Sequence, residues 1–249
     1  NGSFLLIKKQ CSQHCRQSPD QVAKMSFGRW IQRILCALFC AVSILPVFAS
    51  VAFASKAEDE DDLQSAIIRY KSAIQANPKN PKTRLRLGRV LLISGDVKGA
   101  ALQFKQAIDL SPKDAEGHVG LARTLMRSGD HQGAIVRFKN AIELQPNNAD
   151  FHYKLSQALS RAQQNAPAIA ELRQAIKLHK NHAAAHRDLG AQLGLKGDVE
   201  GQILEEKKSL ELAPNDADSY YYLGSAYLVQ GKIRQAQDAL RKCVELDPL

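Results

Sequence analysis

Proline returns along this chain at a fixed interval of 34 residues, and this interval constrains the fold more than any other feature of the sequence. Five of six equally spaced positions hold proline and one holds lysine: Pro78, Pro112, Pro146, Lys180, Pro214 and Pro248. A constant period of roughly 20 to 50 residues is typical of proteins built by stacking copies of one small unit. The sequence therefore predicts a repeat array.

Other positions of the unit recur with the same period, and they are the positions that a pair of packed helices needs. Two of them are always leucine: Leu87, Leu121, Leu155, Leu189 and Leu223, and then Leu110, Leu144, Leu178, Leu212 and Leu246. Two more hold small residues, where helices would cross: Gly88, Ala122, Ser156, Gly190 and Gly224 in the first helix, and Ala100, Ala134, Ala168 and Ala236 in the second, with Gln202 as the exception. Each unit is therefore expected to be a helical hairpin.

Turn residues separate the expected helices. Glycine recurs between the two helices at Gly95, Gly129, Gly197 and Gly231, where a helix C-cap favours a residue that tolerates positive φ, and Gln163 replaces it once. The periodic proline then ends the second helix, because proline has no amide donor and disfavours a helical conformation before it.

A 34-residue helix-turn-helix with small residues at two crossing points, an aromatic residue one turn later (Phe104, Phe138) and a closing proline resembles the tetratricopeptide repeat. The resemblance covers residues 81–249 as five units: 81–114, 115–148, 149–182, 183–216 and 217–249. An acidic linker and half a unit precede them in 55–80. The resemblance implies an all-α fold, a right-handed α-solenoid of helix-turn-helix repeats.

Unit 183–216 departs from the pattern. It carries Gln202, Glu206 and Ser209 where the second helix is expected to have Ala, Phe and Ala. We expect the loosest packing of the array here, either as a shallow defect or as a polar contact surface for a partner.

The N-terminal part of the chain indicates export. Met25 opens a segment with Arg29 and Arg33, followed by an apolar stretch that ends in Ala52-Phe53-Ala54, which is typical of a signal peptide over residues 25–54. The alternative is an uncleaved transmembrane anchor with the repeats outside the cytoplasm. Residues 1–24 are interpreted as a non-native or mis-annotated extension. The repeats are thus expected in the periplasm or secreted, with a membrane as partner only if the segment is uncleaved.

Charge and cysteine content limit the classes of partner. The net charge of +9 falls to about +4 after residue 54, because residues 1–54 hold six Lys or Arg and one acidic residue. This balance is too weak and too interspersed to indicate nucleic-acid binding. Four of the five cysteines precede the expected cleavage site, so only Cys243 remains and no internal disulfide is expected.

In tetratricopeptide arrays the first helices line a concave groove that holds a peptide or a helix of a partner, and the resemblance assigns that role here to eight side chains. They are Arg89, Arg123, Arg127, Tyr153, Gln157, Arg161, Arg187 and Tyr221. Arginine and tyrosine combine directional hydrogen bonds with apolar area, which suits an acidic peptide, a carboxylate or an anionic glycan. The alternative is an ordinary solvated surface.

The sequence offers no basis for catalysis, a metal or a cofactor. Phosphate loops, nucleophile motifs and zinc-binding helix signatures are not recognised in it. His118, His152 and His186 recur at one position of the unit, but a full repeat separates them, so they cannot share one ion and are interpreted as packing residues. His179 and His182 are likewise assigned a structural or solvent-exposed role.

The predicted function is an exported, non-enzymatic scaffold or adaptor that binds a protein or peptide through its groove. Two alternatives stay open: the regulatory region of a larger enzyme such as a glycosyltransferase, and an assembly factor for surface polysaccharide or pili. The last unit has no polar capping helix, so a continuing chain, a partner or self-association through that edge would cover it.

Overall fold

The structure is a computed structural model that describes residues 61–248, and in that range it consists of eleven helices without a strand. The predicted all-α solenoid is confirmed. A helix over residues 61–76 is followed by five pairs: α4 (Pro81–Ile93) and α5 (Val97–Leu110), α6 (Ala115–Arg127) and α7 (His131–Leu144), α8 (Ala149–Arg161) and α9 (Asn165–Leu178), α10 (Ala183–Leu195) and α11 (Val199–Leu212), α12 (Ala217–Val229) and α13 (Ile233–Leu246). The expected extension over 1–24 and the signal segment over 25–54 lie outside the described residues.

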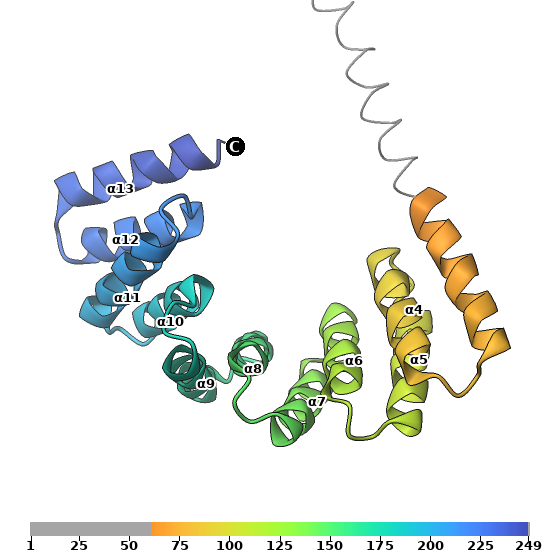
Figure 1. Ribbon diagram of the computed structural model, residues 1–249. Helices are drawn as coiled ribbons and strands as arrows, with labels where there is room; N and C mark the ends of the chain where they lie inside the picture. Colours follow the sequence, from red (N-terminus) through yellow and green to blue (C-terminus); the bar gives the residue numbers. More distant parts are fainter. Residues whose placement is uncertain (1–60, 249) are drawn as a thin grey trace, which may run out of the picture. The chain divides into compact units, whose positions relative to one another are not determined.

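Successive helices pack against each other along the chain from α4 to α13 (Figure 1). First helices also contact each other across the intervening second helix, as α4 does with α6 and α10 with α12. In these neighbouring units the first helices therefore lie side by side, and the candidate site lies on the first helices.

Side-chain caps fix where the helices begin. The carboxylate oxygen Oδ1 of Asp96 accepts a hydrogen bond from the amide of Gly99 at 2.8 Å, and Asp130 and Asp198 repeat this contact at the start of α7 and α11. Such a cap satisfies one of the amides that the first turn of a helix leaves without a partner.

The turn between the paired helices adopts the left-handed conformation that the recurring glycine predicts. Gly95, Gly129, Gly197 and Gly231 have φ between 71° and 92°. Gln163 takes the same conformation with φ of 60°, although it carries a side chain that opposes it. The packing of the helices therefore imposes the turn where the sequence does not favour it.

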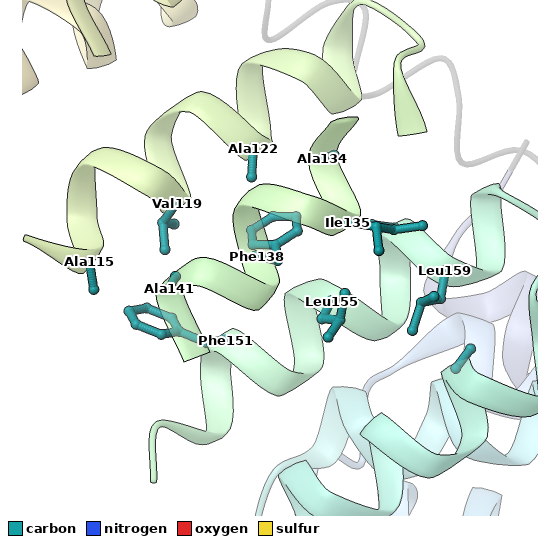
Figure 2. Close-up of a cluster of buried hydrophobic side chains, with 12 residues drawn as sticks. Ala115, Val119, Ala122, Ala134, Ile135, Phe138, Ala141, Phe151, Leu155 and Leu159 are labelled. Carbon is teal, nitrogen blue, oxygen red and sulfur yellow. The ribbon is translucent and has the colours of Figure 1, made fainter. Parts of the chain in front are cut away.

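The core is a series of small apolar clusters between neighbouring units. In one of them Phe138 of α7 packs with Val119 and Ala122 of α6 and with Leu155 of α8 (Figure 2). Small residues leave room for such rings. A Cβ atom added to Gly88, at a crossing point, would lie 3.0 Å from the ring of Phe104, and one added to Gly120 would overlap the same ring. Each apolar cluster thus joins one unit to the next.

Candidate functional site

The first helices form a cleft of about 930 Å³. Its lining comes mainly from α6, α8 and α10, with single contributions from α7 and α12: Arg123, Met126, Arg127, Phe138, Lys154, Ser156, Gln157, Ser160, Arg161, Asp188, Ala191, Gln192 and Tyr222. Residues three or four positions apart share one face of a helix, so each helix presents a short row of side chains to the cleft. We call this the main cleft.

Cations predominate in the main cleft. Arg123, Arg127, Lys154 and Arg161 line it against a single carboxylate, Asp188. Within residues 61–248 none of the four cations has a carboxylate oxygen within 4.0 Å. Arg127 instead donates a hydrogen bond to the backbone carbonyl of Leu92. The main cleft therefore presents positive charge that nearby acidic side chains do not neutralise.

A second cleft of about 310 Å³ adjoins the first, because Arg123 and Arg127 line both. Its apolar lining residues are Leu92, Ile93, Phe104 and Val119. At its rim Arg89 pairs with Glu116 at 2.6 Å between Nη2 and Oε2, and both side chains are about half exposed. Arg89 is consequently less available to an acidic ligand than the cations of the main cleft.

Five of the eight side chains predicted from the sequence line these clefts. Arg89 lines the smaller one, Arg123 and Arg127 line both, and Gln157 and Arg161 line the main cleft. The other three, Tyr153, Arg187 and Tyr221, are not among the lining residues of either cleft.

Arg187 is held by three carboxylates. It lies 3.1 Å from Asp188, 3.2 Å from Asp216 and 3.6 Å from Asp218. Burial disfavours the charge of Arg187, but Asp188 and Asp216 outweigh burial and raise the pKa of the guanidinium. Arg187 therefore ties α10 to the start of α12.

Tyr153 and Tyr221 differ in exposure. The ring of Tyr153 packs against the ring of His182 at a tilt of 49°, with centroids 4.6 Å apart, and its hydroxyl accepts a hydrogen bond from Gln157 at 2.9 Å. Burial, and then the charge of Asp188, raises the pKa of the Tyr153 hydroxyl above its usual value. Tyr221 is 54% exposed and touches the edge of Tyr222, which is the tyrosine that reaches the main cleft.

Several lining residues of the main cleft were not predicted from the sequence, and three of them form one row: Lys154, Asp188 and Tyr222. They stand at equivalent positions of α8, α10 and α12, three residues before Gln157, Ala191 and Ser225. Helical spacing was the signal that could have found them, because a residue three positions before a lining residue lies on the same face.

The polar residues of unit 183–216 do not form a contact surface for a partner, because they are buried. Gln202, Glu206 and Ser209 are 7%, 0% and 0% exposed. Gln202 donates to the carbonyl of Tyr222 at 2.9 Å, and Ser209 donates to the carbonyl of Ala183 at 3.1 Å. The three side chains thus form a buried polar contact, called here the polar crossing, where α10, α11 and α12 meet.

Glu206 is the exception within this crossing, since neither of its carboxyl oxygens has a hydrogen-bond partner. Its Oε1 would lie 2.5 Å from a Cβ atom added to Gly190, so the glycine provides the space that the carboxyl occupies. Burial raises the pKa of Glu206 from 4.5 to about 9. The side chain is therefore a neutral carboxylic acid at pH 7.

Two kinds of feature are absent from residues 61–248, namely a membrane-spanning helix and a metal-binding cluster. The helices in this part of the chain include none that is both long and apolar enough to cross a membrane. In the same range, His, Cys, Asp and Glu side chains form no group of three suited to a metal ion.

Comparison with known proteins places these observations in a family. Tetratricopeptide repeat models match residues 51–115, 125–193 and 207–238, which together make up more than half of the chain. No curated protein sequence matches the chain.

Solved structures resemble the chain over most of the repeats. A crystal structure of MamA is 26% identical, with a TM-score of 0.60, and the match covers 65% of this chain and 94% of that one. YrrB, described as a TPR protein with an unusual peptide-binding site, is 21% identical with a TM-score of 0.60, covering 72% and 92%. PilF of Pseudomonas aeruginosa is 16% identical with a TM-score of 0.63, covering 68% and 77%. At these identities the last two matches show the fold alone. The period, the helical pairs and the matched models agree, and the chain belongs to the tetratricopeptide repeat family.

Proposed function

We propose that the chain is an exported, non-enzymatic scaffold whose main cleft holds an extended acidic segment of a partner protein. One observation carries the proposal: Arg123, Arg127, Lys154 and Arg161 converge on one cleft and have no carboxylate partner within 4.0 Å in the described residues. Carboxylates of a bound segment would form charge-assisted hydrogen bonds with these cations. Each such bond stabilises a complex by roughly 1.5–3 kcal/mol.

Apolar side chains beside the cations add contact area for the segment. Met126 and Tyr222, which are partly exposed, line the main cleft. Aromatic and arginine side chains together are typical of the positions that carry most of the energy of an interface. The partner segment is therefore proposed to combine acidic residues with at least one apolar anchor.

The test is a charge reversal with a matched control. The groove variant replaces Arg123, Arg127, Lys154 and Arg161 by glutamate. The control replaces four exposed cations of the second helices that line neither cleft, Lys105, Lys139, Arg173 and Lys207. Both variants change the net charge equally, so a difference between them reports the position of the charges and not their number.

Binding is measured by fluorescence anisotropy with a labelled peptide of alternating glutamate and leucine, and by capture of partners from an envelope extract. The groove variant should bind at least about 100-fold more weakly, because it loses several charge-assisted bonds. The control should keep the affinity of the parent within a few-fold. Equal losses in both variants would contradict the cleft as the binding site, and circular dichroism checks that both remain helical.

Export is proposed from the sequence of residues 25–54 and has its own test. The N-terminal sequence of the protein isolated from its native cell should begin at Ser55 if the apolar segment is removed after Ala54. A protein that retains the segment and remains with the membrane fraction would indicate an anchor instead.

A further inference from the structure

The last residues of the five first helices stand at one position of the repeat and are of two chemical kinds. They are Ile93, Arg127, Arg161, Leu195 and Val229, called here the end row. The apolar members are largely exposed to solvent, Ile93 by 65%, Leu195 by 74% and Val229 by 73%. Along the chain, the end row therefore places two cations between exposed apolar side chains.

The first part of the end row belongs to the clefts already described. Arg127 lines both clefts, Arg161 lines the main cleft and Ile93 lines the smaller one. Arg127 also donates a hydrogen bond to the backbone carbonyl of Leu92, the residue before Ile93. The ends of α4 and α6 are thus in direct contact, and the end row is continuous with the clefts there.

Helical spacing extends the end row beside the main cleft on α10 and α12. Leu195 follows Ala191 by four residues and Gln192 by three, and Val229 follows Tyr222 by seven. Ala191, Gln192 and Tyr222 all line the main cleft. Residues three, four or seven positions apart share one face of a helix, and α10 and α12 contact each other. Leu195 and Val229 therefore adjoin the cleft, and we call them the apolar ledge.

The surroundings of the apolar ledge strengthen its apolar character. Single exposed apolar side chains are common on protein surfaces, whereas contiguous ones mark sites of interaction. Leu228, next to Val229, is 49% exposed and stands at the position that Met126 of the main cleft has in α6. Asp188 on α10 is the carboxylate of the main cleft and disfavours a second carboxylate at this end. Charge and exposed apolar area thus favour the same kind of ligand group here.

We propose that the end row selects a partner segment whose acidic residues are flanked by apolar residues. In the complex, carboxylates of the segment meet Arg127 and Arg161, and apolar side chains cover Ile93 on one side and the apolar ledge on the other. Arginine binds carboxylates through charge-assisted hydrogen bonds, and covering exposed Leu and Val removes apolar surface from water. The inference rests on the proposed function, because it specifies the order of residues in the segment that the main cleft holds.

The first test compares two labelled peptides that have the same composition and differ in order. Five first helices about 10 Å apart span roughly 40 Å, which an extended chain covers with about twelve residues. One peptide of this length has glutamates in the middle and leucines at both ends, and the other has leucines in the middle and glutamates at both ends. The parent should bind the first at least about ten-fold more tightly, since burial of one leucine contributes about that factor. Equal affinities, or a preference for the second, would overturn the proposal.

A matched pair of variants locates the contact. The ledge variant carries Leu195→Ser and Val229→Ser, and the control carries Leu204→Ser and Val136→Ser. Leu204 and Val136 are 53% and 54% exposed on second helices and line neither cleft, so both variants remove one Leu and one Val from the surface. The ledge variant should bind the leucine-flanked peptide at least about ten-fold more weakly than the control does. Equal affinities of the two variants would contradict the ledge as the contact.

A third peptide, with serines in place of the leucines, separates this inference from the proposed function. The parent and both variants should bind it with equal affinity, because its carboxylates meet only the cations. If the parent binds this peptide while the two variants bind the leucine-flanked peptide equally, the inference fails and the proposed function stands. If the parent binds none of the peptides, the proposed function fails and the inference fails with it.

Sedimentation of the same proteins without peptide tests a different occupant of the apolar ledge. The parent, the ledge variant and the control should sediment alike, because the ledge is assigned to a partner segment. A parent that self-associates, together with a ledge variant that does not, would assign the ledge to a second copy of the chain and overturn the proposal.

Discussion

Replacing Glu206 by glutamine should stabilise the array at neutral pH, although glutamate and glutamine have nearly the same shape. The carboxyl group is fully buried, has no hydrogen-bond partner and has its pKa raised to about 9. In the unfolded chain the same group ionises near 4.5. Folding at pH 7 must therefore return a proton to Glu206, and this costs free energy that an amide does not require.

The free-energy cost follows from the difference between pH 7 and the pKa of Glu206 in the unfolded chain, which is about 2.5 pH units. At about 1.4 kcal/mol per unit, the cost is on the order of 3 kcal/mol. The sign is that of a group that binds more protons when folded: the stability of the parent falls as pH rises from about 4.5 towards 9. The advantage of Glu206→Gln should accordingly be small at pH 4.5 and grow with pH.

The assay is equilibrium unfolding in urea followed by circular dichroism at pH 5, 7 and 8.5, with the difference from the parent taken at each pH. The control is Glu211→Gln, an exposed glutamate on the same helix, which should change stability by less than about 0.5 kcal/mol. Glu206→Leu tests the same reasoning without a polar group. An advantage of Glu206→Gln that stays constant between pH 5 and pH 8.5 would refute the assignment of a neutral, buried acid.

Two further predictions concern backbone and packing. Gln163→Gly should stabilise the array by about 0.5–1 kcal/mol in urea unfolding, because it relieves a side chain held at φ of 60°, and the greater freedom of glycine in the unfolded chain offsets part of the gain. The opposite sign would show that the Gln163 side chain stabilises the turn. Gly120→Ala should destabilise the array by about 1–3 kcal/mol, since its Cβ would overlap the ring of Phe104, and a thermal midpoint equal to that of the parent would show that the ring moves aside freely.

The sequence predicted the features that recur in every unit. The helical pairs, the glycine turns and the small residues at crossings follow from local geometry that repeats, and the positive φ of Gly95 and its equivalents agrees with that reasoning. Repetition also located the face on which Arg123, Arg127 and Arg161 lie. These features depend on contacts within one unit or between equivalent neighbouring units. The residues at one position of the unit therefore recur with the 34-residue period, and the sequence alone shows them.

Contacts that occur once were not predictable in this way. The pairing of Arg187 with Asp216 joins positions 29 residues apart. The equivalent positions of the preceding unit hold Tyr153 and His182, which meet ring against ring and form no such ion pair. Glu206 stands where other units have a buried Phe, and its polar side chain suggested a contact surface for a partner. In the structure Gly190 lies opposite Glu206 and makes room for a buried carboxyl group. To predict the Arg187–Asp216 pair or the buried Glu206, one must know which side chains of two different helices face each other.

The charges along the main cleft are uneven, and we expect them to set the orientation of a bound segment. Arg123 and Arg127 on α6 and Arg161 on α8 lie towards one end, and Asp188 on α10 and Tyr222 on α12 lie towards the other. A carboxylate placed beside Asp188 would be repelled, while one placed between α6 and α8 would meet only cations. The acidic residues of a bound segment are thus directed to the α6–α8 end, and its apolar or basic residues to the side of Tyr222. Asp188→Asn should relax this preference, so that a peptide and its reversed sequence bind with more similar affinity than they do to the parent.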